Sequence, residues 1–459
     1  MGLRTEEKER IKNGIPMEEK TDTKADTQPG KMNGWVALSP LALFLAIFLT
    51  SSLIAGDFYS VPVTVAFLVA SAYSVIISRG RMADRIGIFS KGAGDKNILL
   101  MVWIFILAGA FASSAKAIGS VESTVNLTLA IVPPKFLLAG LFLASCLISM
   151  SIGSSVGTIV ALIPIASGIA GQASLPLSLV AALIVGGSFF GDNLSFISDT
   201  TIAATTSQGS SMKDKFRVNI GIAGPAALIV AAIYTVIGLE YSSTPVIGQI
   251  EPLKLIPYFS VILMAFCGIN VVIVLAAGVL LCLAIGIISG TSPAVLAASM
   301  GEGITGMGEL IIVTLLAGGM LEVIRHNGGI DFIIKGLTGK IGGRRGAEFS
   351  IAALVSLSNL CTANNTIAIL TVGKIAREIT QRFGLDPRKS ASLLDVFSCI
   401  VQCAIPYGAQ MLMASSLTGI PATSIIPWLF YPAALLLMAC IGIIFNYPRN
   451  LSKSLDTKK

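Results

Sequence analysis

The sequence predicts an all-α polytopic membrane protein with two inverted repeats, each consisting of scaffold helices, a re-entrant hairpin and a broken transmembrane helix. Three observations lead to this prediction: the apolar composition, the clustering of basic residues, and the similarity of the two halves. Of the 459 residues, 54% are hydrophobic and only 12% are charged, whereas soluble proteins carry about 25% charged residues. Lipid cannot satisfy backbone hydrogen bonds, so the spanning segments of such a chain should be helices.

The chain divides into two tails and two halves. The first 33 residues carry seven basic and seven acidic side chains and little apolar mass, which predicts a disordered cytoplasmic tail over residues 1–34. A first transmembrane repeat is expected over residues 35–240, and a second, inverted repeat over residues 241–446. Residues 447–459 are expected to form a second cytoplasmic tail.

Basic residues predict the topology. Of the 32 Lys and Arg residues, 28 lie in six segments, which are the two tails and residues 79–96, 213–217, 335–345 and 374–389. Cytoplasmic loops attract Lys and Arg, so all six segments are predicted to lie inside. We therefore expect a multi-pass protein of the bacterial cytoplasmic (inner) membrane with both termini in the cytoplasm. The net charge of +7 belongs to these loops and does not indicate a nucleic-acid partner.

Apolar stretches between the basic segments give the expected spans. In the first half they cover about 35–55, 61–79, 97–115, 176–206 and 218–240, with a hairpin over 136–170. In the second half they cover about 252–267, 269–290, 309–326, 391–417 and 424–446, with a hairpin over 347–373. Basic loops flank the second hairpin on both sides, so a single crossing would place one of those loops outside.

The two halves resemble each other in sequence. Residues 108–122 align with residues 317–331 without a gap, and Lys116 and Glu122 fall opposite a base and an acid. An inverted repeat is the architecture of alternating-access transporters. Channels and membrane enzymes can also contain repeats, so the pattern by itself leaves these classes open.

The densest polar cluster in an apolar setting lies at residues 186–201. Its polar side chains include Asp192, Asn193, Ser195, Ser198, Asp199 and Thr200. Three glycines and an asparagine predict a weakened helix, and a helix broken at mid-membrane exposes carbonyl oxygens that can coordinate a cation. Such hard oxygen ligands suit Na⁺ or H⁺, so we predict Na⁺ at Asp192 and Asp199 as a transported ion, with no cofactor. The alternative is a cytoplasmic helix end with capping aspartates.

Polar residues also mark the two hairpin tips. They are Thr158 in the first hairpin and Asn364, Asn365 and Thr366 in the second. If the fold has two-fold symmetry, the second tip should face residues 186–201 and contribute to a substrate site; the alternative is a helix-capping turn. The matching broken segment at 403–410 contains no acid, so only the first half is expected to supply carboxylates.

Three charged residues are secondary candidates. Glu322 lies inside an expected span and is a second candidate for carrying protons. Lys116 and Glu122 are interpreted as an ion pair that braces the scaffold or as part of a proton path. The seven cysteines lie in apolar segments and do not form a metal-binding pattern.

The motif at residues 191–201, GDNLSFISDTT, resembles the Gly-Asp-x-x-Ser-x-x-Ser-Asp-Thr signature of the NhaC family of Na⁺/H⁺ antiporters in the ion-transporter superfamily. The hairpin tips followed by broken helices resemble the paired Ser-Asn-Thr elements of that superfamily. The resemblance covers about residues 35–446. The motif departs from well-known members at Phe196, where they have proline, and this bears on the substrate.

The resemblance implies a secondary active transporter, not an enzyme, that exchanges Na⁺ for H⁺ by alternating access. The alternative is a Na⁺-coupled transporter or exchanger of a small organic anion or amino acid, because relatives include exchangers thought to move sodium and lactate against malate and protons. The expected partners are Na⁺, H⁺, the lipid bilayer and, in the alternative, a small organic acid. The oligomeric state stays open, with a homodimer among the options.

Overall fold

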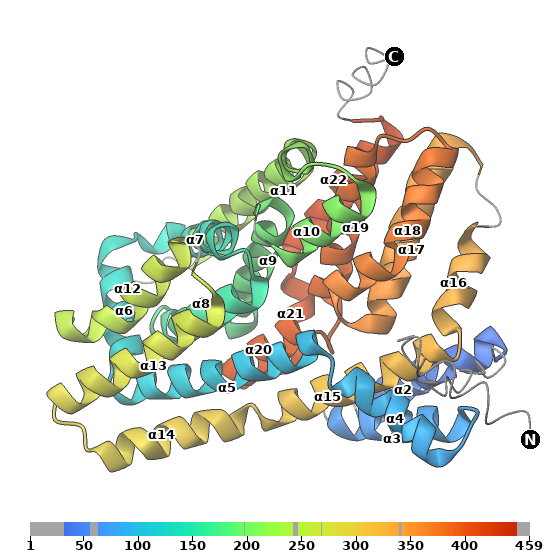
Figure 1. The fold of residues 1–459 in the computed structure, drawn as a ribbon. Coiled ribbons are helices and arrows are strands. Elements are labelled where there is room, and N and C mark those ends of the chain that lie inside the picture. Colours follow the sequence, from blue (N-terminus) through green and yellow to red (C-terminus); the bar gives the residue numbers. More distant parts are fainter. Residues whose placement is uncertain are drawn as a thin grey trace, which may run out of the picture. The chain divides into compact units, whose positions relative to one another are not determined.

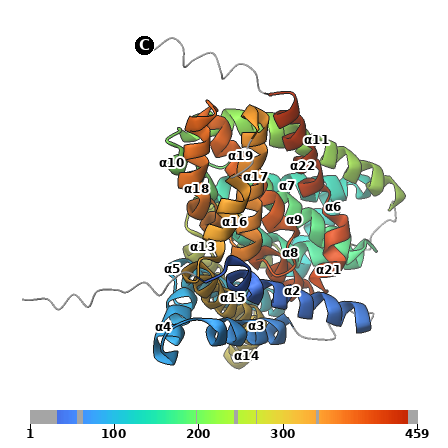
Figure 2. The same ribbon diagram turned by 90° about the vertical axis from the view of Figure 1, so that its right-hand side faces the viewer.

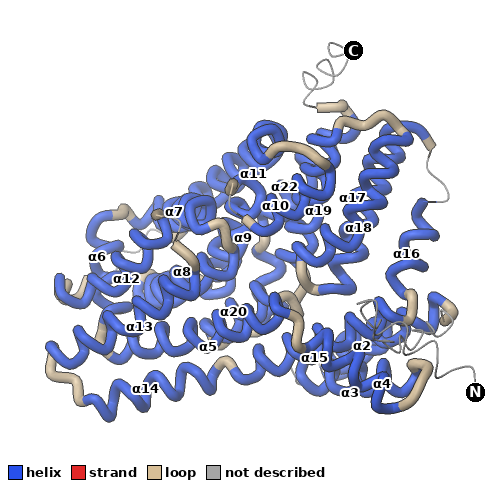
Figure 3. Tube along the Cα trace, in the orientation of Figure 1, coloured by secondary structure: helices blue, strands red, loops and turns tan. Residues whose placement is uncertain are grey.

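A computed structural model describes residues 32–55, 63–196, 198–241, 247–267, 269–338 and 342–447. Within these ranges every regular element is a helix, as Figure 3 shows. Almost all of the two predicted tails lies outside the described residues.

The first half of the chain contains ten α-helices and one short 3₁₀ helix in the described ranges. They are α2 (Gly34–Ala55), α3 (Val63–Ile77), α4 (Met82–Ala93), α5 (Lys96–Ala117), α6 (Ser120–Ile131), η1 (Pro134–Phe136), α7 (Leu137–Ile152), α8 (Ser155–Gln172), α9 (Leu177–Leu194), α10 (Asp199–Gln208) and α11 (Met212–Glu240).

The second half contains eleven α-helices and one short 3₁₀ helix in the described ranges (Figure 1). Its helices are α12 (Pro252–Phe266), α13 (Val271–Ile288), α14 (Pro293–Gly306), α15 (Gly308–His326), α16 (Gly329–Thr338), α17 (Gly343–Thr362), α18 (Asn365–Arg382), α19 (Pro387–Ala404), α20 (Ala409–Thr418), α21 (Ala422–Ile425), η2 (Ile426–Trp428) and α22 (Phe430–Ile444).

Several of these helices are long and apolar enough to cross a membrane. Among the described residues there are eight such stretches, and a bent pair formed by Ala422–Trp428 and Phe430–Ile444 raises the number to nine. A stretch of about 20 apolar residues matches the hydrocarbon core of a bilayer. The protein is therefore a multi-pass membrane protein.

The helix bounds agree with most of the predicted spans. Residues 252–290 divide into α12 and α13, and the two predicted hairpins correspond to α7–α8 and α17–α18. The sequence does not predict α14, which precedes the expected span at 309–326. It also places the start of α11 too late: this helix begins at Met212, so the basic segment 213–217 is helical and not a loop.

The two halves share a run of elements. A two-helix hairpin is followed by a helix pair with a break, α9–α10 in the first half and α19–α20 in the second. The hairpin turns match closely, because each contains one residue with left-handed backbone, Gly153 (φ 69°) and Ala363 (φ 47°). The opposite orientation of the halves in the membrane and the re-entrant path of the hairpins remain predictions.

The broken helices connect the two halves. Each first segment packs on the hairpin of its own half, α9 on α7 and α8, and α19 on α17 and α18. Each second segment packs on the hairpin of the other half: α10 lies along α18, and α20 lies along α8 (Figures 1 and 2). The two breaks therefore lie where hairpins from both halves meet.

Small residues set the spacing between α7 and α9. A Cβ on Gly187 would lie 2.7 Å from Ser145 Cβ, and a Cβ on Gly191 would collide with Ser149. Both serine hydroxyls donate hydrogen bonds to carbonyl oxygens of α9. Glycines and serines four residues apart let membrane helices approach closely. These glycines therefore serve packing. The predicted break lies just after them, since α9 continues to Leu194.

Candidate functional site

The break between α9 and α10 brings the predicted acids to one place. Helix α9 ends at Leu194, Ser195 and Ser198 have extended backbone, and α10 begins at Asp199. Asp192, in the last turn of α9, is only 4% exposed. The two acids therefore lie on either side of an interrupted helix, in agreement with the predicted broken span.

The two hairpin tips reach the same place through matched caps. The hydroxyl of Ser154 accepts a hydrogen bond from Gly157 N at 3.3 Å at the start of α8. The Asn364 side chain accepts one from Ile367 N at 3.0 Å at the start of α18. Asn364 thus caps a helix, which is the alternative interpretation of this turn, and it also faces the cavity. The positive ends of two helices consequently point toward the same region.

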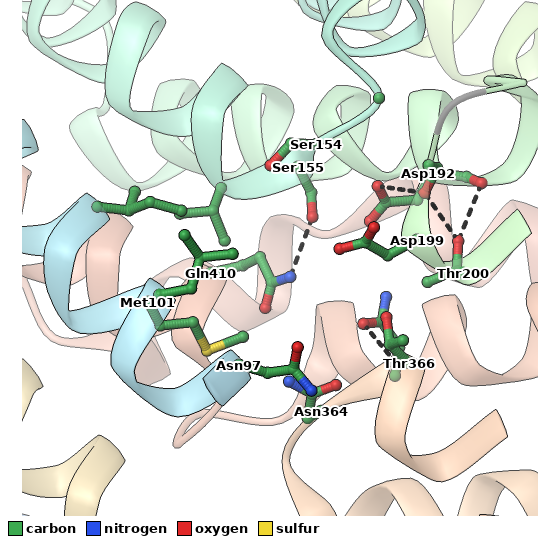
Figure 4. Close-up of a pocket in the computed structure, with 16 residues that line it drawn as sticks. Asn97, Met101, Ser154, Ser155, Asp192, Asp199, Thr200, Asn364, Thr366 and Gln410 are labelled. Carbon is green, nitrogen blue, oxygen red and sulfur yellow. Dashed lines mark hydrogen bonds between the residues drawn. The ribbon is translucent and has the colours of Figure 1, made fainter. Parts of the chain in front are cut away.

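These elements line a partly open cavity of about 110 Å³, in which Asp192 is buried and Asp199 is exposed (Figure 4). Its polar lining comes from α5, α8, α9, α10, α18 and α20 and consists of Asn97, Ser154, Ser155, Asp192, Ser198, Asp199, Thr200, Asn364, Asn365, Thr366 and Gln410. In Figure 4 the carboxyl group of Asp199 points into this space, opposite Asn364. Carboxylates, hydroxyls and amides from both halves of the chain therefore surround one small volume.

Hydroxyl groups surround the Asp192 carboxyl group. The Ser198 hydroxyl donates to Asp192 Oδ1 at 3.4 Å, and Ser155 on α8 lines the same cavity. Ser198 and Thr200 share a hydrogen bond of 3.0 Å. The carboxylate can therefore bind a cation together with neutral oxygen atoms, or bind a proton in its place.

Gln410, at the start of α20, extends the site into the second half. Its Nε2 donates to Ser155 Oγ at 3.0 Å, and its Oε1 accepts from Gln402 Nε2 at 2.9 Å. Gln402 also donates to the carbonyl oxygen of Ala363 at 2.8 Å. The break in α19–α20 is thus connected to both hairpin tips. The sequence does not single out Gln410 or Asn97, although Gln410 lies in the segment that matches the first break.

The cavity contains most of the predicted site residues and not all of them. Asp192, Ser198, Asp199, Thr200, Asn364, Asn365 and Thr366 line it. Three others lie outside it. Thr158 is buried in α8 and donates to the carbonyl oxygen of Ser154; Asn193 turns its amide toward Phe189 and Tyr431. Ser195 is buried in the break, and its carbonyl oxygen accepts a hydrogen bond from Thr201.

A buried ion pair lies next to the break, and the sequence predicts neither partner. Lys215 Nζ and Asp395 Oδ2 are 2.9 Å apart, and the side chains are 1% and 0% exposed. Lys215 therefore belongs to the helical interior and not to a cytoplasmic loop. Asp395 is a buried carboxylate of the second half, but it does not line the cavity, whose two carboxylates both come from the first half. Its position inside the predicted span 391–417 is the signal that could have identified it, since an acid inside a span needs a partner.

Backbone carbonyls at the end of α9 already have donors. The carbonyl oxygen of Asn193 accepts from Lys215 Nζ and from Asn219 Nδ2, both at 2.8 Å. The carbonyl oxygen of Asp192 accepts from the hydroxyl groups of Thr200 at 3.3 Å and Thr201 at 3.4 Å. Donors from α10 and α11 therefore already contact these carbonyls, and their coordination of a cation stays a prediction.

The three secondary candidates lie away from the cavity. Glu322 pairs with Arg325 at 2.9 Å and with Lys91 at 3.5 Å. Lys116 and Glu122 are exposed at the end of α5 and the start of α6. Among the described residues no ion pair joins these two, so the expected brace is not formed.

The fold and the site together define a class of protein. Broken helices and hairpin tips from two similar halves meet at a cavity lined by carboxylates, which is the arrangement of secondary transporters. A model of the Na⁺/H⁺ antiporter family matches residues 35–239 and again residues 223–447. The chain belongs to the Na⁺/H⁺ antiporter family.

Individual relatives are distant. The Na⁺/H⁺ antiporter NhaC of Alkalihalophilus pseudofirmus is 22% identical over 449 residues, covering 89% of this chain and 94% of that protein. NhaC of Bacillus subtilis is 24% identical, covering 58% of this chain and 66% of that protein. The malate-2H⁺/Na⁺-lactate antiporter of the same organism is 24% identical, covering 60% and 65%. The matched stretch thus spans slightly less than two thirds of both B. subtilis proteins.

A solved structure is also similar. The YdaH transporter of Alcanivorax borkumensis aligns over 89% of this chain and 99% of that chain, with a TM-score of 0.43 and 14% identity.

Proposed function

We propose that this protein exchanges Na⁺ for H⁺ across the cytoplasmic membrane by alternating access, with Asp192 and Asp199 carrying the cargo. The observation behind the proposal is that both carboxylates line a single polar cavity at a helix break. Family membership supports antiport of these ions. Both ligands neutralise the same acids, so they compete for one site.

Electrostatics then couples the two ions. A carboxylate that is 4% exposed, as Asp192 is, carries a large desolvation cost when it is charged and unpaired. Binding of either Na⁺ or H⁺ removes that cost, and the empty charged site is disfavoured. If only the neutralised site changes its access from one side of the membrane to the other, each transported Na⁺ must be exchanged for protons and uncoupled leak is suppressed.

Proteoliposomes with an imposed pH gradient test this proposal. Apparent Na⁺ affinity should rise with pH until both carboxyl groups are ionised, because protons leave the site free for Na⁺. Asp192→Asn and Asp199→Asn preserve shape and remove charge, so each should abolish Na⁺-dependent proton release in protein that still inserts and purifies. Asp84→Asn, at an exposed position in the first turn of α4, is the matched control. Exchange at the wild-type rate and pH profile by both site variants would place the site elsewhere.

A second candidate is exchange of a small carboxylate or amino acid coupled to Na⁺. It is favoured by the amide groups of Asn97, Asn364 and Asn365 in the cavity and by the two helix N-termini that point toward it, which attract anions. A B. subtilis relative is the malate-2H⁺/Na⁺-lactate antiporter. Counterflow of labelled malate, lactate and arginine in the same proteoliposomes tests this second candidate. Absence of flux for all three would count against it and leave Na⁺/H⁺ exchange as the proposed function.

A further inference from the structure

We propose that the ammonium group of Lys215 occupies a second cation site behind the cavity, where it takes the place of an alkali metal ion. This site differs from the cargo site in its residues, since neither Lys215 nor Asp395 lines the cavity. It is formed by the end of α9, the start of α10, and side chains of α11 and α19. The inference concerns a resident charge of the protein, so it does not depend on which ion is transported.

Four oxygen atoms surround the ammonium nitrogen. They are Thr201 Oγ1 at 2.6 Å, Asn193 O at 2.8 Å, Asp395 Oδ2 at 2.9 Å and Asp192 O at 3.5 Å. One carboxylate, one hydroxyl and two carbonyls at the end of an interrupted helix form the ligand set that holds Na⁺ in transporters with broken helices. The negative end of the α9 dipole adds to the attraction for a cation.

The surroundings are closed and rich in oxygen. Lys215 is 1% exposed, and Asp395 and Asn219 are 0% exposed. Asn219 Nδ2 donates to Asp395 Oδ2 at 2.8 Å and so fixes the carboxylate against the ammonium. The Oδ1 atoms of Asp395, Asn193 and Asn219 have no hydrogen-bond partner among the described residues. A lone carboxylate in this place would be strongly destabilised unless a cation or a proton neutralised it, and the Lys215 ammonium supplies that charge.

A covalently attached cation has a consequence for transport. Lys215 is part of α11, so its charge stays in the protein while cargo ions enter and leave. Asp395 is balanced by this resident charge, which leaves only Asp192 and Asp199 to be balanced by cargo. The same contacts hold the end of α9 in place, so Lys215 also acts as a positioning residue for Asp192.

Replacement of the ammonium by free Na⁺ tests the inference. Lys215→Ala should remove the cation, keep its oxygen ligands and leave room for an ion. The variant is made together with Asp192→Asn, so that Na⁺ in the cavity does not contribute. The purified full-length chain in detergent is unfolded by heat at constant ionic strength, with NaCl replacing choline chloride. We expect a low Tm in choline and a saturable rise of several degrees with Na⁺, because an ion that binds only the native state stabilises it.

Two further variants make the test specific. Adding Asp395→Asn to this double variant removes the charged ligand and should eliminate the Na⁺-dependent rise. Lys389→Ala with Asp192→Asn is the matched control, because Lys389 also pairs with a buried carboxylate, that of Glu348 at 2.8 Å. Its other contacts, Gly442 O at 3.3 Å and Asn446 Oδ1 at 3.2 Å, are longer and lie away from the break, so Na⁺ should have no saturable effect there.

The outcomes separate clearly. An equal Na⁺ effect on the Lys215 and Lys389 variants, or none on the Lys215 variant, overturns the inference. If Lys215→Ala cannot be recovered folded in choline, its recovery in NaCl alone supports the inference. If it is recovered in neither, Lys215→Gln is measured in the same way, and a Na⁺-independent Tm for that variant overturns the inference. Because the readout is stability in a protein with an altered cavity, its failure leaves the proposed exchange untouched.

Discussion

Asp192 presents its two polar groups to two different environments. The carboxyl group faces the cavity and the hydroxyl groups of Ser155 and Ser198. The backbone carbonyl faces the other way, toward Thr201 and Lys215. Asp192 therefore contributes its carboxyl group to the cavity and its backbone carbonyl to the contacts with Thr201 and Lys215. The contacts of the backbone carbonyl with Thr201 and Lys215, which lie outside the cavity lining, help to position the carboxylate.

Asn365 should contribute to cargo affinity. Its side chain is 7% exposed and lines the cavity at the second hairpin tip. Loss of one hydrogen bond or ligand contact from the Asn365 amide to the bound substrate would cost about 1 kcal/mol. Asn365→Ala should therefore weaken apparent Na⁺ or substrate affinity by roughly five-fold. The measurement is the initial transport rate at limiting substrate.

Asn270→Ala is the matched control for Asn365→Ala. Asn270 caps α13 by accepting from Val272 N at 2.9 Å, away from the cavity. This substitution should lower stability by about 1 kcal/mol and leave affinity unchanged. Equal transport kinetics of the Asn365 variant and the wild type at limiting substrate would exclude a binding role for Asn365.

Ala363 should be a point of backbone strain. Its φ of 47° lies in the left-handed region, which costs a residue with a Cβ atom about 1–2 kcal/mol. Ala363→Gly should therefore raise the free energy of unfolding by about 1 kcal/mol. Gly153→Ala, at the equivalent turn with φ 69°, should lower it by a similar amount. Thermal unfolding of both purified variants measures this, and a shift of the same sign in both would contradict it.

At the scale of elements, α9 shows how packing overrides local propensity. Glycine weakens an isolated helix, yet α9 is continuous from Leu177 to Leu194. Close contact with α7 stabilises it, since the glycine positions face serines whose hydroxyl groups bond to α9 carbonyls. The break begins only at Ser195, where hydroxyl groups and the Lys215 ammonium replace the missing helical hydrogen bonds.

Gly191→Ala should destabilise the contact between α7 and α9. The added methyl group would meet the Ser149 backbone, which cannot yield as a flexible side chain would. Overpacking of this kind costs about 1–3 kcal/mol, so Tm and the yield of folded protein should fall. Gly171→Ala, in α8 with nothing near its added Cβ, should be neutral or stabilising. Equal stability of the two variants would refute the close-packing explanation.

At the scale of the whole described chain, each half holds the other half's hairpin. Gln208 at the end of α10 donates to the carbonyl oxygen of Gly373 in α18 at 3.0 Å, and Gln410 of α20 donates to Ser155 of α8 at 3.0 Å. Each hairpin is therefore bonded to the broken helix of the opposite half. This coupling suits a site that opens alternately to two sides.

The predicted topology can be tested by cysteine labelling in intact cells. The native cysteines are first replaced, since Cys267 is exposed. Single cysteines at positions 213 and 382, both exposed and within basic segments, should resist an impermeant reagent applied from outside. A cysteine at Lys135, in the exposed connection before α7, should react. Position 340 lies outside the described residues, and a cysteine there should also resist the reagent. Labelling at 340 without labelling at 382 would contradict the hairpin assignment.

The sequence by itself determines the class of fold and half of the site. Long apolar stretches, basic segments and two acids in an apolar setting are local properties of the sequence. The cost of removing charges from water allows each to be interpreted without knowing which residues lie near it in space. They predict the helical membrane fold, the two hairpins, and a site containing Asp192, Asp199 and the second hairpin tip.

Only the tertiary structure decides what surrounds those acids. In sequence Lys215 looks like any basic residue at a helix start, and its burial depends on Asp395, whose other bonding partner, Asn219, lies 176 residues away in the chain. Gln410 likewise reaches Ser155 over 255 residues. The sequence suggests that carbonyl oxygens at the end of α9 lack hydrogen-bond donors. In the structure, Lys215 and Asn219 donate to one of them, that of Asn193. A buried charge requires its partner in space, and spatial partners are set by how helices pack and not by their order in the chain.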